Sequence, residues 1–177
     1  PDATWDNGFG PACPLEGIGK DDVLQIKGAN SYFQNLTVKT SMGDAHGRDI
    51  AVNDQSNRTI FKDACLWGYQ DTYVSNNQNG KFYFEGGVIR GRTDYVCGKG
   101  GVYYNKVTFR QVKSGYLAVP SVPKQYGYIF QSCKITGDAS DVSGTFTLGR
   151  PWGKGTPTAL FIDTEMEVVP TAAGWNE

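Results

Sequence analysis

The chain repeats a short pattern of bulky apolar and polar positions six times. The copies cover residues 32–38, 60–66, 83–89, 103–109, 129–135 and 160–166, and each opens on an aromatic pair or an aliphatic–aromatic pair. Counted from the second residue of the pair, position +3 is small or apolar and position +5 is large and apolar in the first five copies, while the places between are mostly polar. This alternation is typical of a β-strand with one buried face. Glycine at position +7 of three copies, Gly68, Gly91 and Gly137, predicts the turn that ends the strand.

The spacing of the copies predicts a stacked solenoid. Successive pairs lie 20 to 31 residues apart, and a unit of that length cannot bury its own apolar face without a neighbour. Short strands, frequent turns and the lack of helical periodicity favour an all-β parallel β-helix with coils of about 20–30 residues. An antiparallel sandwich with coincidental spacing is the alternative interpretation.

In a stacked solenoid, residues at equivalent positions of neighbouring coils lie next to each other, and two aspartates occupy such positions. Asp71 and Asp94 each stand ten residues after the second residue of their copies, Phe61 and Phe84. Equivalent positions on neighbouring coils lie about 5 Å apart, so the two carboxyl groups are expected side by side. Like charges at that distance disfavour joint ionisation and separate the two pKa values, which serves catalysis rather than stability. The alternative is two turn aspartates that point separately into water.

Composition fits a globular protein with one domain, residues 1–177. The chain is 39% hydrophobic and has a net charge of −1. This balance gives no electrostatic reason to expect a nucleic acid or an anionic membrane as a partner. No apolar run approaches the ~20 residues of a transmembrane helix, and the first residues show no signal peptide. The 23 glycines and 13% aromatic residues favour turns and strands over helices.

The cysteines and the single histidine predict no metal site. The four cysteines, Cys13, Cys65, Cys97 and Cys133, contain no Cys-x-x-Cys motif, and their spacing selects none of the three possible disulfide pairings. His46 lies between glycines and is interpreted as a turn residue.

Three separate motifs resemble the pectin methylesterase (pectinesterase) family. Gly68–Tyr73 is similar to the family's Gly-Tyr-Gln-Asp-Thr-Leu, Gly91–Gly98 to its Gly-x-x-Asp-Phe-Ile-Phe-Gly, and Leu148–Trp152 matches its Leu-Gly-Arg-Pro-Trp. The closing Val169–Trp175 also resembles the family's C-terminal region. The resemblance implies a right-handed parallel β-helix that uses no metal or organic cofactor. It also implies hydrolysis of the methyl esters of galacturonate units in pectin, with release of methanol.

The resemblance assigns roles to individual residues. Asp94 matches the family's nucleophile, Asp71 its general acid/base, and Arg150 the arginine that pairs with the nucleophile. Gln70 matches a glutamine that holds the oxyanion. An attacking carboxylate must be ionised, which a neighbouring guanidinium favours, whereas the other carboxyl must begin protonated to deliver a proton to departing methoxide. The expected contacts to the polysaccharide are Trp152, Arg48, Tyr73 and Tyr95.

Two features depart from the family's pattern. Arg48 stands where the family has a second oxyanion glutamine, and it could donate to the oxyanion or form an ion pair with Asp49, Asp54 or another acid. The chain also lacks the family's first coils, so it resembles the catalytic middle and the C-terminal part of a pectinesterase. A secreted, periplasmic or cell-surface location follows from the resemblance alone.

Further side chains are candidates for contacts to a sugar or a uronate. The aromatic candidates are Trp67, Tyr116 and Tyr126, because aromatic faces suit pyranose rings. For Trp67 and Tyr126, simple packing in the protein is the alternative. The basic candidates, for which solvated turn charges are the alternative, are Arg90, Arg92, Lys99 and Lys124.

Two other function classes remain open. A uronan glycosidase or lyase on a similar β-helix is one, because two carboxylates about 5 Å apart also fit a retaining glycosidase. A non-catalytic β-helix that only binds polysaccharide is the other.

Overall fold

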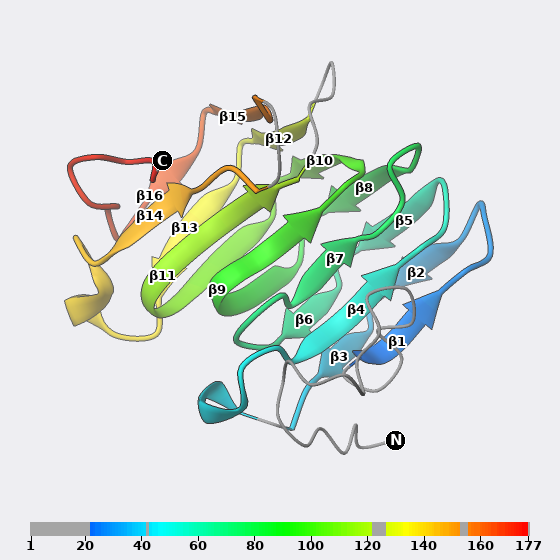
Figure 1. The fold of residues 1–177 in the computed structure, drawn as a ribbon, viewed down its shortest axis with the longest axis horizontal. Helices are drawn as coiled ribbons and strands as arrows, with labels where there is room; N and C mark the ends of the chain where they lie inside the picture. The colour runs from blue at the N-terminus through cyan, green and yellow to red at the C-terminus, as the bar shows by residue number, and fades with distance from the viewer. Residues whose placement is uncertain (1–21, 42, 122–126, 153–155, 177) are drawn as a thin grey trace.

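The computed structural model describes residues 22–41, 43–121, 127–152 and 156–176, which form a parallel β-helix (Figure 1). Its coils follow one another along the long axis from β1 (Asp22–Ile26) to β16 (Glu165–Met166). Two short 3₁₀ helices interrupt the strands, η1 (Asp44–His46) and η2 (Ser140–Val142). The β-helix predicted from the repeat is confirmed, and the antiparallel sandwich is excluded, because the strands within each sheet pair in parallel.

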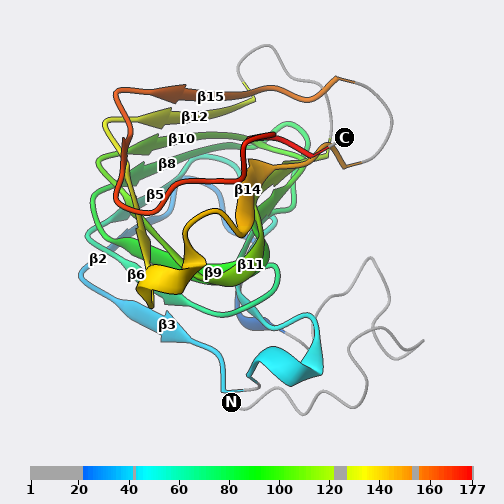
Figure 2. The ribbon, with the colours of Figure 1, turned by 90° about the vertical axis from the view of Figure 1, so that its left-hand side faces the viewer.

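The first half of each repeat forms one face of the solenoid, a six-stranded sheet that Figure 2 shows nearly edge-on. Its strands are β2 (Tyr32–Gln34), β5 (Thr59–Lys62), β8 (Lys81–Glu85), β10 (Gly101–Asn105), β12 (Tyr128–Gln131) and β15 (Ala159–Ile162). The second residue of each predicted pair points inward, and these rings form a continuous column. Neighbouring ring centroids in that column are 4.2 to 5.2 Å apart. Stacked aromatic rings thus bury the coils against one another.

The remaining strands form a ten-stranded sheet that folds around the other faces. In addition to β1 and β16 it contains β3 (Thr37–Lys39), β4 (Ile50–Asp54), β6 (Cys65–Trp67), β7 (Tyr73–Ser75), β9 (Val88–Gly98), β11 (Thr108–Pro120), β13 (Lys134–Gly137) and β14 (Phe146–Gly149). β9 pairs with β6 through its first residues and with β7 through its last, so this strand continues around a corner of the solenoid. The segment between β6 and β7 turns the same corner on the preceding coil.

Each predicted strand in fact belongs to two strands that meet at a left-handed corner. The corner residue is always two positions after the second residue of the pair, with φ between 48° and 62°: Asn35, Asp63, Gly86, Lys106, Ser132 and Asp163. Four of these are Asn, Asp or Gly, the residues that adopt a left-handed backbone most readily. The repeat therefore encodes a corner that the alternation of apolar positions does not reveal.

The glycines at position +7 only partly match their predicted role. Gly68 directly follows β6, and Gly137 is the last residue of β13. Gly91 instead lies inside β9, where a Cβ atom would come within 2.1 Å of the Cβ of Tyr95. Its absent side chain allows the strand to bend tightly rather than to end.

In the described part of the chain, no helix is long and apolar enough to cross a membrane. The three cysteines there, Cys65, Cys97 and Cys133, form no disulfide with one another. Cys13, Lys124 and Tyr126 lie outside the described residues. His46 ends η1, a short turn of the kind its glycine neighbours predict.

Candidate active site

Asp71 and Asp94 occupy equivalent positions on neighbouring coils. The backbone pairs Gln70 with Thr93 and Tyr73 with Val96, so the register on both sides of the aspartates aligns Asp71 with Asp94. Adjacent strands are about 4.8 Å apart. Both aspartates have a left-handed backbone, with φ of 58° and 53°, and both are buried, at 6% and 5% exposure. The shared register predicted from the repeat is confirmed.

Asp94 is held by a guanidinium through two hydrogen bonds. Arg150 Nε donates to Asp94 Oδ1 at 3.1 Å, and Nη2 donates to Oδ2 at 2.5 Å. Arg150 directly follows β14, which pairs with β11 beside β9, and its guanidinium lies 4.1 Å from the centroid of the Tyr116 ring. Burial raises the pKa of Asp94 above its ordinary value, and the hydrogen bonds and charge of Arg150 oppose that rise. The expected contact between these two residues is therefore present, but burial outweighs the arginine.

Asp71 has an arginine of its own. Arg48 Nε lies 3.1 Å from Asp71 Oδ2, and both side chains are largely buried. Of the two alternatives for Arg48, the structure shows the ion pair, with Asp71 as the acid instead of Asp49 or Asp54. On the other carboxylate oxygen, the thiol of Cys97 donates to Asp71 Oδ1 at an Sγ–O distance of 3.6 Å.

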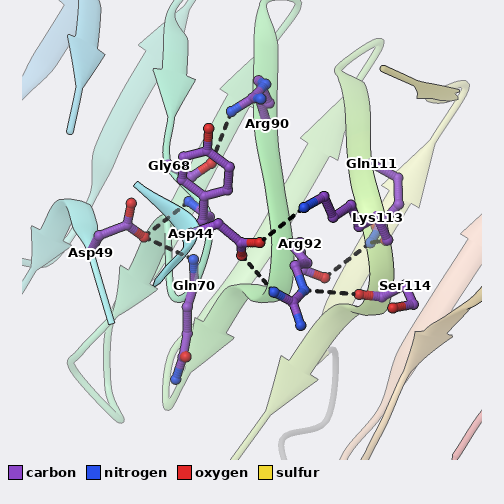
Figure 3. Close-up of polar contacts among 10 residues, drawn as sticks. Asp44, Asp49, Gly68, Gln70, Arg90, Arg92, Gln111, Lys113 and Ser114 are labelled. Carbon is purple, nitrogen blue, oxygen red and sulfur yellow. Dashed lines mark hydrogen bonds and ion pairs between the residues drawn. The ribbon is translucent and has the colours of Figure 1, made fainter. Parts of the chain in front are cut away.

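Gln70 precedes Asp71 at the same corner of the solenoid. Its backbone pairs with Arg48 on the preceding coil and with Thr93 on the next coil, which places Gln70 beside both candidate carboxylates. Its N–H donates to Asp49 Oδ1 at 2.8 Å, while its side chain extends away from Asp49 (Figure 3). An amide side chain at this position can donate a hydrogen bond to an oxyanion that forms near Asp71 or Asp94.

One hollow is lined by Asp71 itself, and a second is lined by Arg150, the partner of Asp94. A cleft of about 290 Å³ is lined by Arg48, Asp71, Cys97, Lys99 and Trp152 among others. Trp152 is 47% exposed, so its ring is available to a ligand. A second hollow of about 510 Å³ has Arg150 and Thr93 in its wall, together with Arg92 and Tyr116. Of the sequence candidates, Trp152, Arg48 and Lys99 therefore line the cleft that contains Asp71, and Tyr116 and Arg92 line the hollow beside Arg150.

The assignment of Tyr73 and Tyr95 to substrate contacts is wrong. Both side chains have 0% exposure and belong to the core, so no polysaccharide can reach them. The chain leaves each aspartate corner with these rings pointing inward, and Tyr73 donates from its hydroxyl to the buried Asp54 at 3.3 Å. The motif positions they occupy are apolar in the family's pattern, which is a signal for burial.

The remaining basic candidates make ion pairs or stacking contacts. Arg90 pairs with Asp138 and lies over the rings of Trp67 and Tyr69, at 5.4 and 4.9 Å. Trp67 is thus a packing partner of Arg90, as its alternative interpretation held. Arg92 pairs with Asp44 of η1, at 2.6 Å, on the wall of the second hollow (Figure 3).

The sequence points to Asp49 only as a partner for Arg48, and the structure gives it another role. Asp49 is fully buried and binds the backbone that carries Gln70. Burial raises its pKa to about 6, against hydrogen bonds from Thr40, Gln70 and Tyr69 that lower it, and the charge of Asp44 adds to the rise. The spacing of 20 and 21 residues between Asp49 and its two backbone partners equals about one coil, and this was the available signal.

Comparison with known proteins assigns a family to this arrangement. The family model described as Pectinesterase matches residues 20–177. An Arabidopsis thaliana relative named as a pectinesterase is 28% identical over 167 residues, which cover 92% of this chain and 45% of that protein. The chain spans about half or less of the length of the curated relatives it matches first.

Solved structures agree with the fold. A pectin methylesterase from carrot superposes with a TM-score of 0.80 at 18% identity, covering 88% of this chain and 52% of that one. A pectin methylesterase mutant in complex with a hexasaccharide gives a TM-score of 0.73 at 22% identity, covering 83% and 54%. The expected right-handed parallel β-helix is confirmed by these superpositions. From the family model, the motifs and the fold together, the chain belongs to the pectinesterase family.

Proposed function

We propose that this protein hydrolyses methyl esters of galacturonate units in pectin and releases methanol. The observation that carries the proposal is the pair of buried aspartates on neighbouring coils, of which Asp94 accepts hydrogen bonds from two nitrogens of the Arg150 guanidinium. Family membership supports the reaction class, and the hexasaccharide complex of a structural neighbour supports a polysaccharide ligand. A cell-wall substrate lies outside cells, so we propose that the protein acts there. We also propose that residues 1–177 belong to a single pectinesterase-like β-helix domain.

In the first half of the reaction, the ionised Asp94 attacks the ester carbonyl carbon. The carbonyl electrons move to oxygen, and the side-chain amide of Gln70 donates to the resulting oxyanion, a contribution of a few kcal/mol in related chemistry. When the tetrahedral intermediate collapses, the bond to methoxide breaks and Asp71 gives it a proton. Methanol leaves, and an anhydride joins Asp94 to the uronate.

In the second half, Asp71 acts as the base. It takes a proton from water, which attacks the uronate carbonyl of the anhydride, and Asp94 departs as a carboxylate. The uronate leaves as a free acid, and Asp71 again carries its proton. Arg150 keeps Asp94 oriented in both halves, and it stabilises the carboxylate that must attack and later depart.

Arg48 gives Asp71 a setting that the family pattern does not predict. A guanidinium 3.1 Å from Asp71 favours the ionised carboxylate, the form needed in the second half of the reaction. The same contact opposes the protonated form needed in the first half. We propose that Arg48 sets the pH range over which Asp71 can do both.

A product assay on the purified chain tests this function. Incubation with methyl-esterified pectin is expected to give methanol without new reducing ends and without unsaturated sugars. New reducing ends or unsaturated products would instead identify a glycosidase or a lyase. Retention of the chain on pectin with none of these products would identify a binding protein.

A further inference from the structure

The corner that carries Asp94 is held by a carbonyl of the coil before it. The N–H groups of Arg92 and Thr93 both donate to the carbonyl oxygen of Tyr69, at 2.6 and 3.0 Å. Asp71 also donates its N–H to Thr93 O, at 3.1 Å. The two aspartate corners are thus locked to each other through backbone hydrogen bonds.

The corner that carries Asp71 needs the same support from its own preceding coil. The N–H groups of Tyr69 and Gln70 are the equivalents of those of Arg92 and Thr93, one coil earlier in register. They donate to a side chain, Asp49 Oδ1, at 2.9 and 2.8 Å (Figure 3). The carboxylate of Asp49 therefore does for this corner what the Tyr69 carbonyl does for the next.

Asp49 is itself fixed from both sides. Its N–H donates to the carbonyl of Gln70 at 3.1 Å, so that it binds both the donor and the acceptor of that residue's backbone. Its second oxygen, Oδ2, accepts a hydrogen bond from Thr40 Oγ1 at 2.7 Å, and the side chain has no exposed surface. A buried carboxylate is costly unless its oxygens are hydrogen-bonded, and here each oxygen accepts at least one hydrogen bond shorter than 3 Å.

We propose that Asp49 is a positioning residue that holds Gln70 and Asp71 in their catalytic geometry by acting as a surrogate backbone carbonyl. The inference rests on the proposed function of that site. Gln70 must aim its amide at an oxyanion, and Asp71 must reach the leaving oxygen. A displacement of about 1 Å in such groups can lower the rate by two orders of magnitude.

Three variants separate positioning from simple stability. Asp49→Asn keeps an oxygen for the two N–H groups and can donate its amide to Thr40, whereas Asp49→Ala removes the acceptor. Asp54→Ala is the matched control, because Asp54 is also fully buried near the same strand, at the other end of β4, and accepts from the N–H and hydroxyl of Ser56. Both alanine variants lose a buried acceptor, but only Asp49 touches the candidate catalytic corner.

The kinetic test is methanol release from esterified pectin at saturating and limiting substrate. Asp49→Ala is expected to lower kcat by about 10- to 100-fold with a small change in KM. Asp49→Asn should keep most of the wild-type kcat. Asp54→Ala should keep the wild-type kcat but have a lower Tm. Wild-type kcat in folded Asp49→Ala would overturn the proposal. An equal loss in Asp49→Asn would also overturn it, because the charge and not the acceptor would then matter.

Amide hydrogen exchange tests, independently of catalysis, whether the Asp49 carboxylate holds the N–H groups of Tyr69 and Gln70. The amides of Tyr69 and Gln70 should be protected in the wild type and in Asp49→Asn, and should exchange at least tenfold faster in Asp49→Ala than in Asp54→Ala. Unchanged protection of these two amides in Asp49→Ala would refute the proposed role of Asp49. If the wild type released no methanol, the proposed function would fail, while this measurement would still decide whether Asp49 holds the corner.

Discussion

Arg48 and Asp71 form a largely buried ion pair, with 3.1 Å between Nε and Oδ2, so each of the two central aspartates has its own arginine. The pairs differ in geometry. Arg150 donates to Asp94 from two nitrogens, Nε and Nη2, while Arg48 contacts Asp71 through Nε. The two carboxylates are therefore held side by side by two fixed positive charges, which lowers the cost of burying them together.

Replacing Arg48 should change the pH dependence of the reaction more than its maximum. In Arg48→Gln the loss of the positive charge lets Asp71 keep its proton to higher pH, so the alkaline limit of methanol release should move upward. A pH–rate profile of wild type and variant measures this. Arg110→Gln, which breaks an exposed pair with Asp138, is the control and should leave both limits in place. An unmoved alkaline limit in Arg48→Gln would count against Asp71 as the proton donor.

Replacing Arg150 should act at the acid limit. Burial raises the pKa of Asp94 and Arg150 opposes it, so Arg150→Lys, which cannot reproduce the planar fork, should let the pKa of Asp94 rise further. Asp94 then needs a higher pH to ionise, and the acid limit of kcat/KM should move upward, with kcat reduced by about 100-fold. A shift of the acid limit toward lower pH would reverse this assignment.

The buried Asp49 should make the free energy of unfolding depend on pH. Its pKa is raised from 3.8 to about 6 in the folded protein, so the folded state binds the proton more tightly than the unfolded state. Stability from this group is present below pH 4 and is lost as pH rises through 6, by at most about 3 kcal/mol. The side chain of Asp49→Asn cannot titrate. The free energy of unfolding of this variant, relative to that of the wild type, should therefore increase between pH 4 and pH 7. Urea unfolding at both pH values measures the difference, and parallel changes would contradict it.

The inward ring column should dominate the stability of the coils. Phe130 is fully buried, with ring centroids 4.9 Å from Tyr104 and 4.2 Å from Phe161. Phe130→Ala should cost about 3–5 kcal/mol of unfolding free energy. Leu160→Ala, on the outer face of the same sheet at 48% exposure, should cost less than about 1 kcal/mol. Comparable losses in denaturant unfolding would mean that the ring column is not the main support.

The sequence revealed the coil register because identical positions recur at coil spacing, and register alone aligns Asp71 with Asp94. It did not reveal the left-handed corners, since Lys106 and Ser132 adopt them without being residues that favour them. The sequence does not distinguish the burial of Tyr73 and Tyr95 from contact with a substrate, because an aromatic ring beside a catalytic motif suits both a core and a sugar. The partner of Arg48 depends on side-chain direction at a corner, which spacing does not determine.

Methanol release by the wild type and by Asp94→Asn shows most directly whether Asp94 attacks the ester. The amide is nearly isosteric and can still accept from Arg150, so the variant should fold and bind pectin like the wild type. We expect methanol from the wild type and a loss of at least about 1,000-fold in the rate of the variant. Turnover by Asp94→Asn close to that of the wild type would contradict it.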